Sequence, residues 1–117
     1  MNTNQNVGKY GEDRAAEYLE RLGYRLVERN WRCAAGEIDI VAKDKDCLVF
    51  TEVKTRTRTG FGHPFEAITQ SKMLKMRQLV GEWCKANQAP SSQVRLDAIS
   101  VLVTGGRVHI EHLKQVF

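Results

Sequence analysis

Two short apolar segments that carry acidic residues constrain the fold of this chain more than any other feature. They run over residues 36–43 and 47–54, on either side of a polar turn at residues 44–46. Alternating side chains and a short turn predict two β-strands that pair as an antiparallel hairpin. Both faces are apolar near the turn, which is typical of central strands that other elements cover. The face without acids is expected to carry Ile38, Ile40, Ala42, Val49 and Val53.

Four charged side chains of this hairpin are expected to form a cluster on the other face. If the turn is centred between Lys45 and Asp46, Asp39 faces Glu52 and Glu37 faces Lys54. Facing residues point to the same side of a sheet. A slip of one residue in the pairing would separate the four groups.

Two interpretations of this cluster remain open. Like charges that face each other on a sheet cost about 0.2–1 kcal/mol, and more when they are desolvated. A hard divalent cation between Asp39 and Glu52 would offset the repulsion. In the alternative, Lys54 neutralises Glu52 and Glu37 while Asp39 caps a nearby loop. Acids within otherwise apolar strands are uncommon, which favours a site.

The rest of the chain predicts a small α/β fold. A helix is expected over residues 7–22, with Asn6 as its N-cap and Gly23 in the left-handed position at its end. Its apolar side is expected to consist of Tyr10, Tyr18, Leu19 and Leu22. The other expected elements are strands at 24–31, 94–103 and 107–113 and a helix at 69–87.

These elements define the expected fold class and domain organisation. A strand–helix–strand unit in one sheet requires a parallel crossover. The fold class is therefore α/β, with a mixed central β-sheet flanked by α-helices. Residues 1–6 are expected to be a flexible tail, and residues 7–117 to form a single domain, because 117 residues leave no room for two.

Composition excludes several classes of protein. No apolar run approaches the roughly 20 residues of a membrane span, and the polar N-terminus lacks a signal-peptide pattern. A cytoplasmic location is therefore expected. The 18 Lys and Arg residues exceed the 14 Asp and Glu residues by 4, which is compatible with a nucleic-acid partner. The three cysteines have no zinc-site spacing and are expected to be free thiols.

Several motifs carry a resemblance to known proteins. The pattern D-x(12)-E-V-K, from Asp39 to Lys54, resembles the acid–acid–lysine motif of the restriction-endonuclease-like nucleases, although Ile38 stands where that motif often has proline. Nearly the whole chain resembles the YraN-like family, which is regarded as predicted nucleases distantly similar to archaeal Holliday-junction resolvases. That resemblance is carried by G-K-Y-G-E, L-G-Y, R-N-W-R, G-E-I-D, E-V-K-T-R and R-L-D.

The resemblance implies a catalytic site that uses Mg²⁺ or Mn²⁺. Asp39 and Glu52 would hold the metal, and Glu12 on the first helix would complete the site directly or through water. Lys54 would orient the attacking water or stabilise the charge that develops on phosphorus, and Glu37 would support the metal ligands. Glu17 is the competing helix-borne acid. Glu12 is also explained by the favourable position of an anion in the first turn of a helix.

The same resemblance implies a nuclease that acts on DNA, including branched or structured DNA. Arg56 and Arg58, beyond the second hairpin strand, and Gln70 and Lys72, near the start of the second helix, would contact phosphates. A homodimer is compatible with the resemblance, because resolvases use two sites for two strands. The alternative is a non-catalytic nucleic-acid-binding protein that retains the fold.

Other polar residues in strands have structural interpretations. Asp97 lies in an apolar strand, where a structural pair with Arg95 or Arg32 is favoured over a catalytic role. His109 and His112 are three residues apart, so they point to opposite faces of their strand and do not form a metal-ligand pair.

Overall fold

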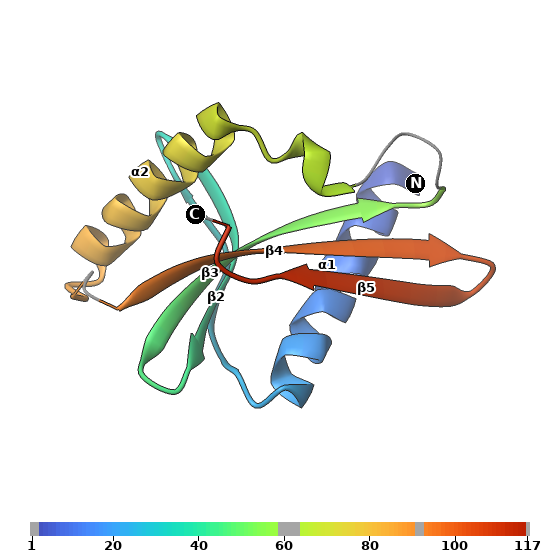
Figure 1. Cartoon of the computed structure of the whole chain (residues 1–117), viewed down its shortest axis with the longest axis horizontal. Helices are drawn as coiled ribbons and strands as arrows, with labels where there is room; N and C mark the ends of the chain where they lie inside the picture. The colour runs from blue at the N-terminus through green and yellow to red at the C-terminus, as the bar shows by residue number, and fades with distance from the viewer. Residues whose placement is uncertain (1–2, 59–63, 91–92, 117) are drawn as a thin grey trace.

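The computed structural model of this chain describes residues 3–58, 64–90 and 93–116. It consists of a single mixed sheet with a helix on each face (Figure 1). The helices are α1 (Thr3–Arg21) and α2 (Gln70–Ala86), and a 3₁₀ turn, η1 (Pro64–Ala67), precedes α2. The strands are β1 (Arg25–Cys33), β2 (Gly36–Asp44), β3 (Cys47–Arg56), β4 (Val94–Thr104) and β5 (Arg107–Leu113).

The strands lie in the order β1-β2-β3-β4-β5. The β3–β4 pair is parallel, and β1–β2, β2–β3 and β4–β5 are antiparallel. The segment between the parallel strands contains η1 and α2, so the predicted strand–helix–strand crossover is confirmed. The mixed α/β class is confirmed as well, and the arrangement is compatible with a restriction-endonuclease-like fold. Within the described residues, no helix is both long and apolar enough to cross a membrane.

Helix α1 begins earlier than its sequence pattern predicts. It starts at Thr3 rather than at residue 7, so Asn6 lies inside the helix and the prediction that it is the N-cap is wrong. No proline interrupts the segment before Val7, and each added residue extends the helix by one hydrogen bond. The predicted end is confirmed, because Gly23 has a φ of 94° and donates its N–H to the Glu20 carbonyl.

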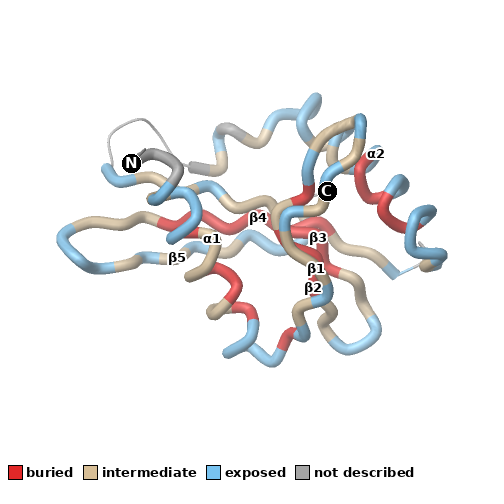
Figure 2. Tube along the Cα trace, turned by 180° about the vertical axis from the view of Figure 1, so that it is seen from behind, coloured by how far each residue is buried: buried red, intermediate tan, exposed pale blue. Residues whose placement is uncertain are grey.

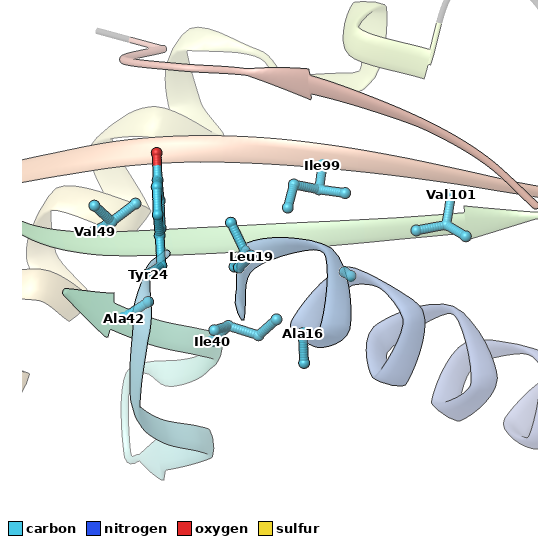
Figure 3. Close-up of a cluster of buried hydrophobic side chains, with 9 residues drawn as sticks. Ala16, Leu19, Tyr24, Ile40, Ala42, Val49, Ile99 and Val101 are labelled. Carbon is cyan, nitrogen blue, oxygen red and sulfur yellow. The ribbon is translucent and has the colours of Figure 1, made fainter. Parts of the chain in front are cut away.

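The buried side of α1 consists mainly of small residues. Ala15, Ala16 and Leu19 are buried against the sheet in the cluster that Figure 3 shows. Tyr10 and Leu22 are exposed, so the prediction that they belong to the buried side is wrong. Gly11, one turn before Ala15, lies so close to Thr55 that a Cβ there would overlap the threonine side chain. Small side chains therefore determine which side of α1 faces the sheet.

Helix α2 covers part of the opposite face of the sheet (Figure 1). The Thr69 hydroxyl accepts a hydrogen bond from the Lys72 N–H and caps the first turn of the helix. Trp83 is buried, its ring lies edge-on to Phe50 at 5.4 Å, and its Nε1 donates to Glu28 at 2.9 Å. Figure 2 shows that the buried residues concentrate in the central strands and on the inward sides of the helices.

The predicted hairpin register is confirmed from the turn as far as Ile40, which pairs with Thr51. Ile40 and Val49 share one face, as expected, and that face packs against α1, but Ile38 packs in the cluster beneath α2. The regular alternation of β2 is therefore broken at Asp39, and the prediction that Ile38 shares a face with Ile40 is wrong. The described β2–β3 pairs end at this point, while β2 remains paired with β1.

Candidate active site

Asp39 lies where β2 and β3 stop pairing. The Val53 N–H donates to Oδ2 of Asp39 at 2.8 Å, so a side-chain oxygen replaces a backbone partner for β3. The expected direct pairing of Asp39 with Glu52 is therefore absent from the described β2–β3 pairs. The carboxylate is half-buried, and it forms no ion pair with a described Lys or Arg side chain.

The electrostatic environment of Asp39 disfavours its charged form. Burial has the largest effect and raises the pKa of Asp39 from 3.8 to about 6, against the opposing effect of the Val53 hydrogen bond. The negative charges of Glu12, Glu37 and Glu52 raise this pKa further. Three acids predicted for the site thus lie near enough to Asp39 to repel it. A bound cation would relieve that repulsion.

Glu52 and Lys54 point to the α2 side of the sheet. Both line a small pocket with Phe65 and Ile68, which lie in and after η1, and with Lys72 of α2. Their shared face, predicted from strand alternation, is confirmed. Lys72, predicted to contact nucleic acid, is thereby placed beside both residues.

Three other predicted nucleic-acid contacts lie outside the lining of this pocket, at the start of α2 and at or just beyond the end of β3. Gln70 is the exposed first residue of α2 and does not line the pocket with Lys72. Arg56 is half-buried at the end of β3, and Arg58 is exposed two residues beyond it. Arg56 and Arg58 both form interactions within the protein.

Glu12 is held by a strand residue that the sequence did not single out. Arg29 of β1 lies 3.3 Å from Oε1 of Glu12 through Nη2 and donates a stronger 2.7 Å hydrogen bond to Asp13. That hydrogen bond lowers the pKa of Asp13. Glu17 instead pairs with Arg14 at 2.6 Å, and its charge is not among those that act on Asp39. Of the two acids on α1, Glu12 is thus the one that acts electrostatically on Asp39.

Glu37 faces a second arginine of β1. The register pairs it with Arg32, and the two side chains form an ion pair of 3.0 Å. The expected pairing of Glu37 with Lys54 is therefore wrong, because β2 at this point follows β1 and has left β3. Pairing β1 with β2 would have identified Arg32 as the partner of Glu37. Arg29 contacts Glu12 and Asp13 of α1, so its role depends on how α1 packs beside β1.

The donor groups fit a weakly ligated hard cation rather than a closed metal cage. Across residues 3–58, 64–90 and 93–116, no three His, Cys, Asp or Glu side chains are close enough to form a metal site. Mg²⁺ typically uses only one or two carboxylates and keeps several waters. Asp39 and Glu52 provide such oxygens, and Asp39 has a charge that a cation would compensate. The described cysteines are free thiols, as expected.

A separate buried network surrounds Asp97. Arg95 donates to both of its oxygens, at 2.8 and 2.9 Å, and His112 and the Gln115 N–H lie at 2.7 and 3.0 Å. Burial alone would raise the pKa of Asp97, but the hydrogen bonds from His112 and Arg95 outweigh it and hold that pKa below its usual value. Of the two predicted partners of Asp97, Arg95 is confirmed, whereas Arg32 pairs with Glu37. Tyr18 extends the network from α1 to His112.

The fold and the acidic site together indicate the class of protein to which this chain belongs. The chain is a mixed α/β protein, compatible with the restriction-endonuclease-like fold, in which Asp39 and Glu52 lie near the end of the central strand pair. Residues 11–101 match the family described as uncharacterised protein family UPF0102, and the chain belongs to that family.

Relatives in this family align along almost the entire chain. A UPF0102 protein of Beutenbergia cavernae is 45% identical over 117 residues, which cover 99% of both chains. One from Renibacterium salmoninarum is 47% identical over 115 residues, covering 97% of this chain and 98% of its own. One from Rhodococcus opacus is 42% identical over 118 residues, with both chains covered in full.

Proposed function

We propose that this protein is a metal-dependent nuclease that hydrolyses phosphodiester bonds in DNA, including branched or structured DNA. The observation that carries the proposal is the environment of Asp39. A half-buried carboxylate accepts the Val53 N–H at a break in the central hairpin, and the charges of Glu12, Glu37 and Glu52 act on it. Such clustered acids are costly without a cation, and perturbed carboxylates concentrate at functional sites.

Each residue of the site has a chemical role in this proposal. Asp39 and Glu52 would hold Mg²⁺ or Mn²⁺, and Glu12 would act directly or through water. The bound metal would polarise the scissile phosphate and lower the pKa of a water molecule. Lys54, exposed and on the same face as Glu52, would orient that water or stabilise developing negative charge. Glu37 would act through Asp39 rather than on the substrate.

The substrate would be held by cations around the site. Lys72 lines the same pocket as Glu52, Arg56 follows Lys54 at the end of β3, and Arg58 lies two residues beyond the strand. Together with Gln70 they would contact phosphates without reading base sequence. A cytoplasmic location and a homodimer with one site for each strand of a junction belong to the same proposal.

A cleavage assay with matched variants tests the proposal. Purified protein is incubated with labelled junction, flap and linear DNA, with Mg²⁺, Mn²⁺ or EDTA. We expect metal-dependent cleavage that Asp39→Asn and Glu52→Gln abolish. The controls Asp46→Asn, in the turn of the same hairpin, and Glu20→Gln, exposed on α1, should retain full activity. Failure to cleave any substrate in the panel, or cleavage that survives both site variants, would contradict the proposal.

A second candidate function is nucleic-acid binding without catalysis. The observation in its favour is that Glu12 is engaged by Arg29, and that no group of three metal-binding side chains forms within the described part of the chain. This function predicts salt-sensitive binding that does not respond to divalent metal. It also predicts that Asp39→Asn and Glu52→Gln leave binding and biological role intact.

A further inference from the structure

The outer halves of β4 and β5 form an open surface on the α2 side of the sheet. Figure 1 shows these strand halves extending beyond α2 and η1, with α1 behind them. The other face of β5 is covered, because Val108 and Ile110 pack against the hydrophobic cluster beneath α1. The alternate residues of β5, Arg107, His109 and Glu111, are exposed on the opposite face.

The strand register aligns this face with the candidate active site. Across the sheet, Lys54 pairs with Ser100 and Ser100 with Glu111. One step outward, Arg56 pairs with Leu102 and Leu102 with His109.

The next step outward places Thr104 of β4 beside Arg107 of β5. Two rows of polar side chains, on β3 and β5, therefore run along both sides of β4 and away from Glu52.

The charges in these rows suit a phosphate backbone. The β3 row carries Lys54 and Arg56, and the β5 row carries Arg107 and the hydrogen-bond donor His109. Glu111 is the one acidic residue among residues 107–113. The two rows are separated by two strand spacings, about 10 Å, and alternate residues repeat about every 6.7 Å. At this spacing, neighbouring side chains of one row can contact different phosphates of a strand rather than the same one.

Arg107 has no ion-pair or hydrogen-bond partner within the described part of the chain. It begins β5 after the Gly105–Gly106 turn, is exposed, and forms no ion pair with a described side chain. An exposed arginine at the tip of a protruding hairpin, with no ion pair to the described residues, is available to an external anion.

We propose that the outward face of the β4–β5 hairpin binds the sugar–phosphate backbone of a nucleic acid, with Arg107 and His109 as contacts additional to those on β3 and α2. The surface leads the backbone along β4 to Glu52. The direction of this path rests on the proposed nuclease function, whereas the binding itself needs no catalysis.

Fluorescence anisotropy with labelled DNA in EDTA tests the surface without cleavage. We expect Arg107→Gln to lower affinity by about 5- to 10-fold at 0.1 M salt and to reduce the slope of log K against log salt by about 1. Arg107→Glu should weaken binding further, and His109→Gln should have a smaller effect. The matched control is Arg25→Gln, an exposed arginine that begins β1 at the other edge of the sheet.

The outcomes separate this inference from the proposed function. Binding by the Arg107 variants that equals that of Arg25→Gln, or no binding of DNA by the unchanged protein, would overturn the inference. Weaker binding by the Arg107 variants without any metal-dependent cleavage would support the surface and contradict the nuclease. If sedimentation shows a dimer that Arg107→Glu dissociates while DNA affinity is unchanged, the face binds a second copy and the inference is wrong.

Discussion

The backbone N–H of Val53 donates a 2.8 Å hydrogen bond to Oδ2 of Asp39, just beyond the last described β2–β3 pair. The carboxylate thus satisfies a strand donor that has lost its backbone partner. This contact fixes Asp39 at the strand break, and its other oxygen accepts no hydrogen bond from a described residue. One side chain therefore both ends the hairpin pairing and presents an acceptor to the site.

Removing the charge of Asp39 should stabilise the metal-free protein at neutral pH. The folded state raises the pKa of Asp39 from 3.8 to about 6, so it binds this proton more tightly than the unfolded chain does. The stability that the protonated Asp39 contributes is therefore complete below about pH 4 and is lost as pH rises to about 6. In urea unfolding at pH 7.5, Asp39→Asn should be more stable than the unchanged protein by about 1–3 kcal/mol.

The same comparison at pH 4 should show little difference, because Asp39 is then protonated. Asp46→Asn serves as the control for loss of an aspartate from this hairpin. Equal or lower stability of Asp39→Asn at pH 7.5 would mean that the carboxylate is not destabilised by its surroundings.

Glu12 and Glu17 should differ in their effect on cleavage. Glu12 acts electrostatically on Asp39, whereas Glu17 pairs with Arg14 on the helix surface. Glu12→Gln should reduce the rate about 10- to 100-fold, the range for groups that support a metal site. Glu17→Gln should leave the rate unchanged. The same loss in both variants would show that the effect is general to α1 rather than specific to the site.

The Asp97 network should contribute to stability and not to DNA binding. Asp97→Asn leaves Arg95 with a weaker buried partner, and the loss should approach the about 3–5 kcal/mol measured for broken buried ion pairs. Since the folded state lowers the pKa of Asp97, its contribution is present above about pH 4 and is lost on further acidification. Urea unfolding at neutral and at acid pH measures both the loss of stability in Asp97→Asn and its dependence on pH.

His109→Gln, on the exposed face of the strand that carries His112, is the stability control for this network and should unfold like the unchanged protein. If Asp97→Asn does not fold, Arg95→Lys provides a milder change in the same pair. A loss below about 1 kcal/mol in either variant would contradict a stabilising role.

The contact between Gly11 and Thr55 should make Gly11 intolerant of substitution. A Cβ at Gly11 would overlap the Thr55 side chain, so Gly11→Ala should lower the free energy of unfolding by about 1–3 kcal/mol. Gly8→Ala, on the same helix with no atom near its Cβ position, should instead stabilise by about 0.5–1 kcal/mol. Thermal unfolding distinguishes the two, and equal effects would contradict close packing of α1 on β3.

Local patterns were sufficient to predict most elements of the fold. The hairpin register near the turn and the left-handed Gly23 follow from alternation, turn length and glycine chemistry, which act within a few residues. The parallel β3–β4 pair follows from the strand–helix–strand order and the crossover that this order requires. The buried side of α1 departs from the pattern of its large apolar residues, because Gly11 and Ala15 face the sheet. The close approach of β3 makes small residues the ones that pack.

The candidate site was predictable in its composition but not in its geometry. Glu37, Asp39 and Glu52 stand out because they interrupt apolar strands, whereas Glu12 lies on a helix and follows only from the family resemblance. Their arrangement depends on β2 leaving β3 at Asp39, and the partners of Glu12 and Glu37 come from β1. These are tertiary effects, and strand alternation alone does not indicate where a ladder ends.

The most direct test of the account is a crystal structure of the protein soaked in Mn²⁺, with anomalous diffraction used to locate the metal. The account predicts an anomalous peak bonded to carboxylate oxygens of Asp39 and Glu52, and no such peak in crystals of Asp39→Asn. A metal-free site in fully soaked crystals, or a peak bonded to neither carboxylate, would contradict the central claim that these acids hold a catalytic cation.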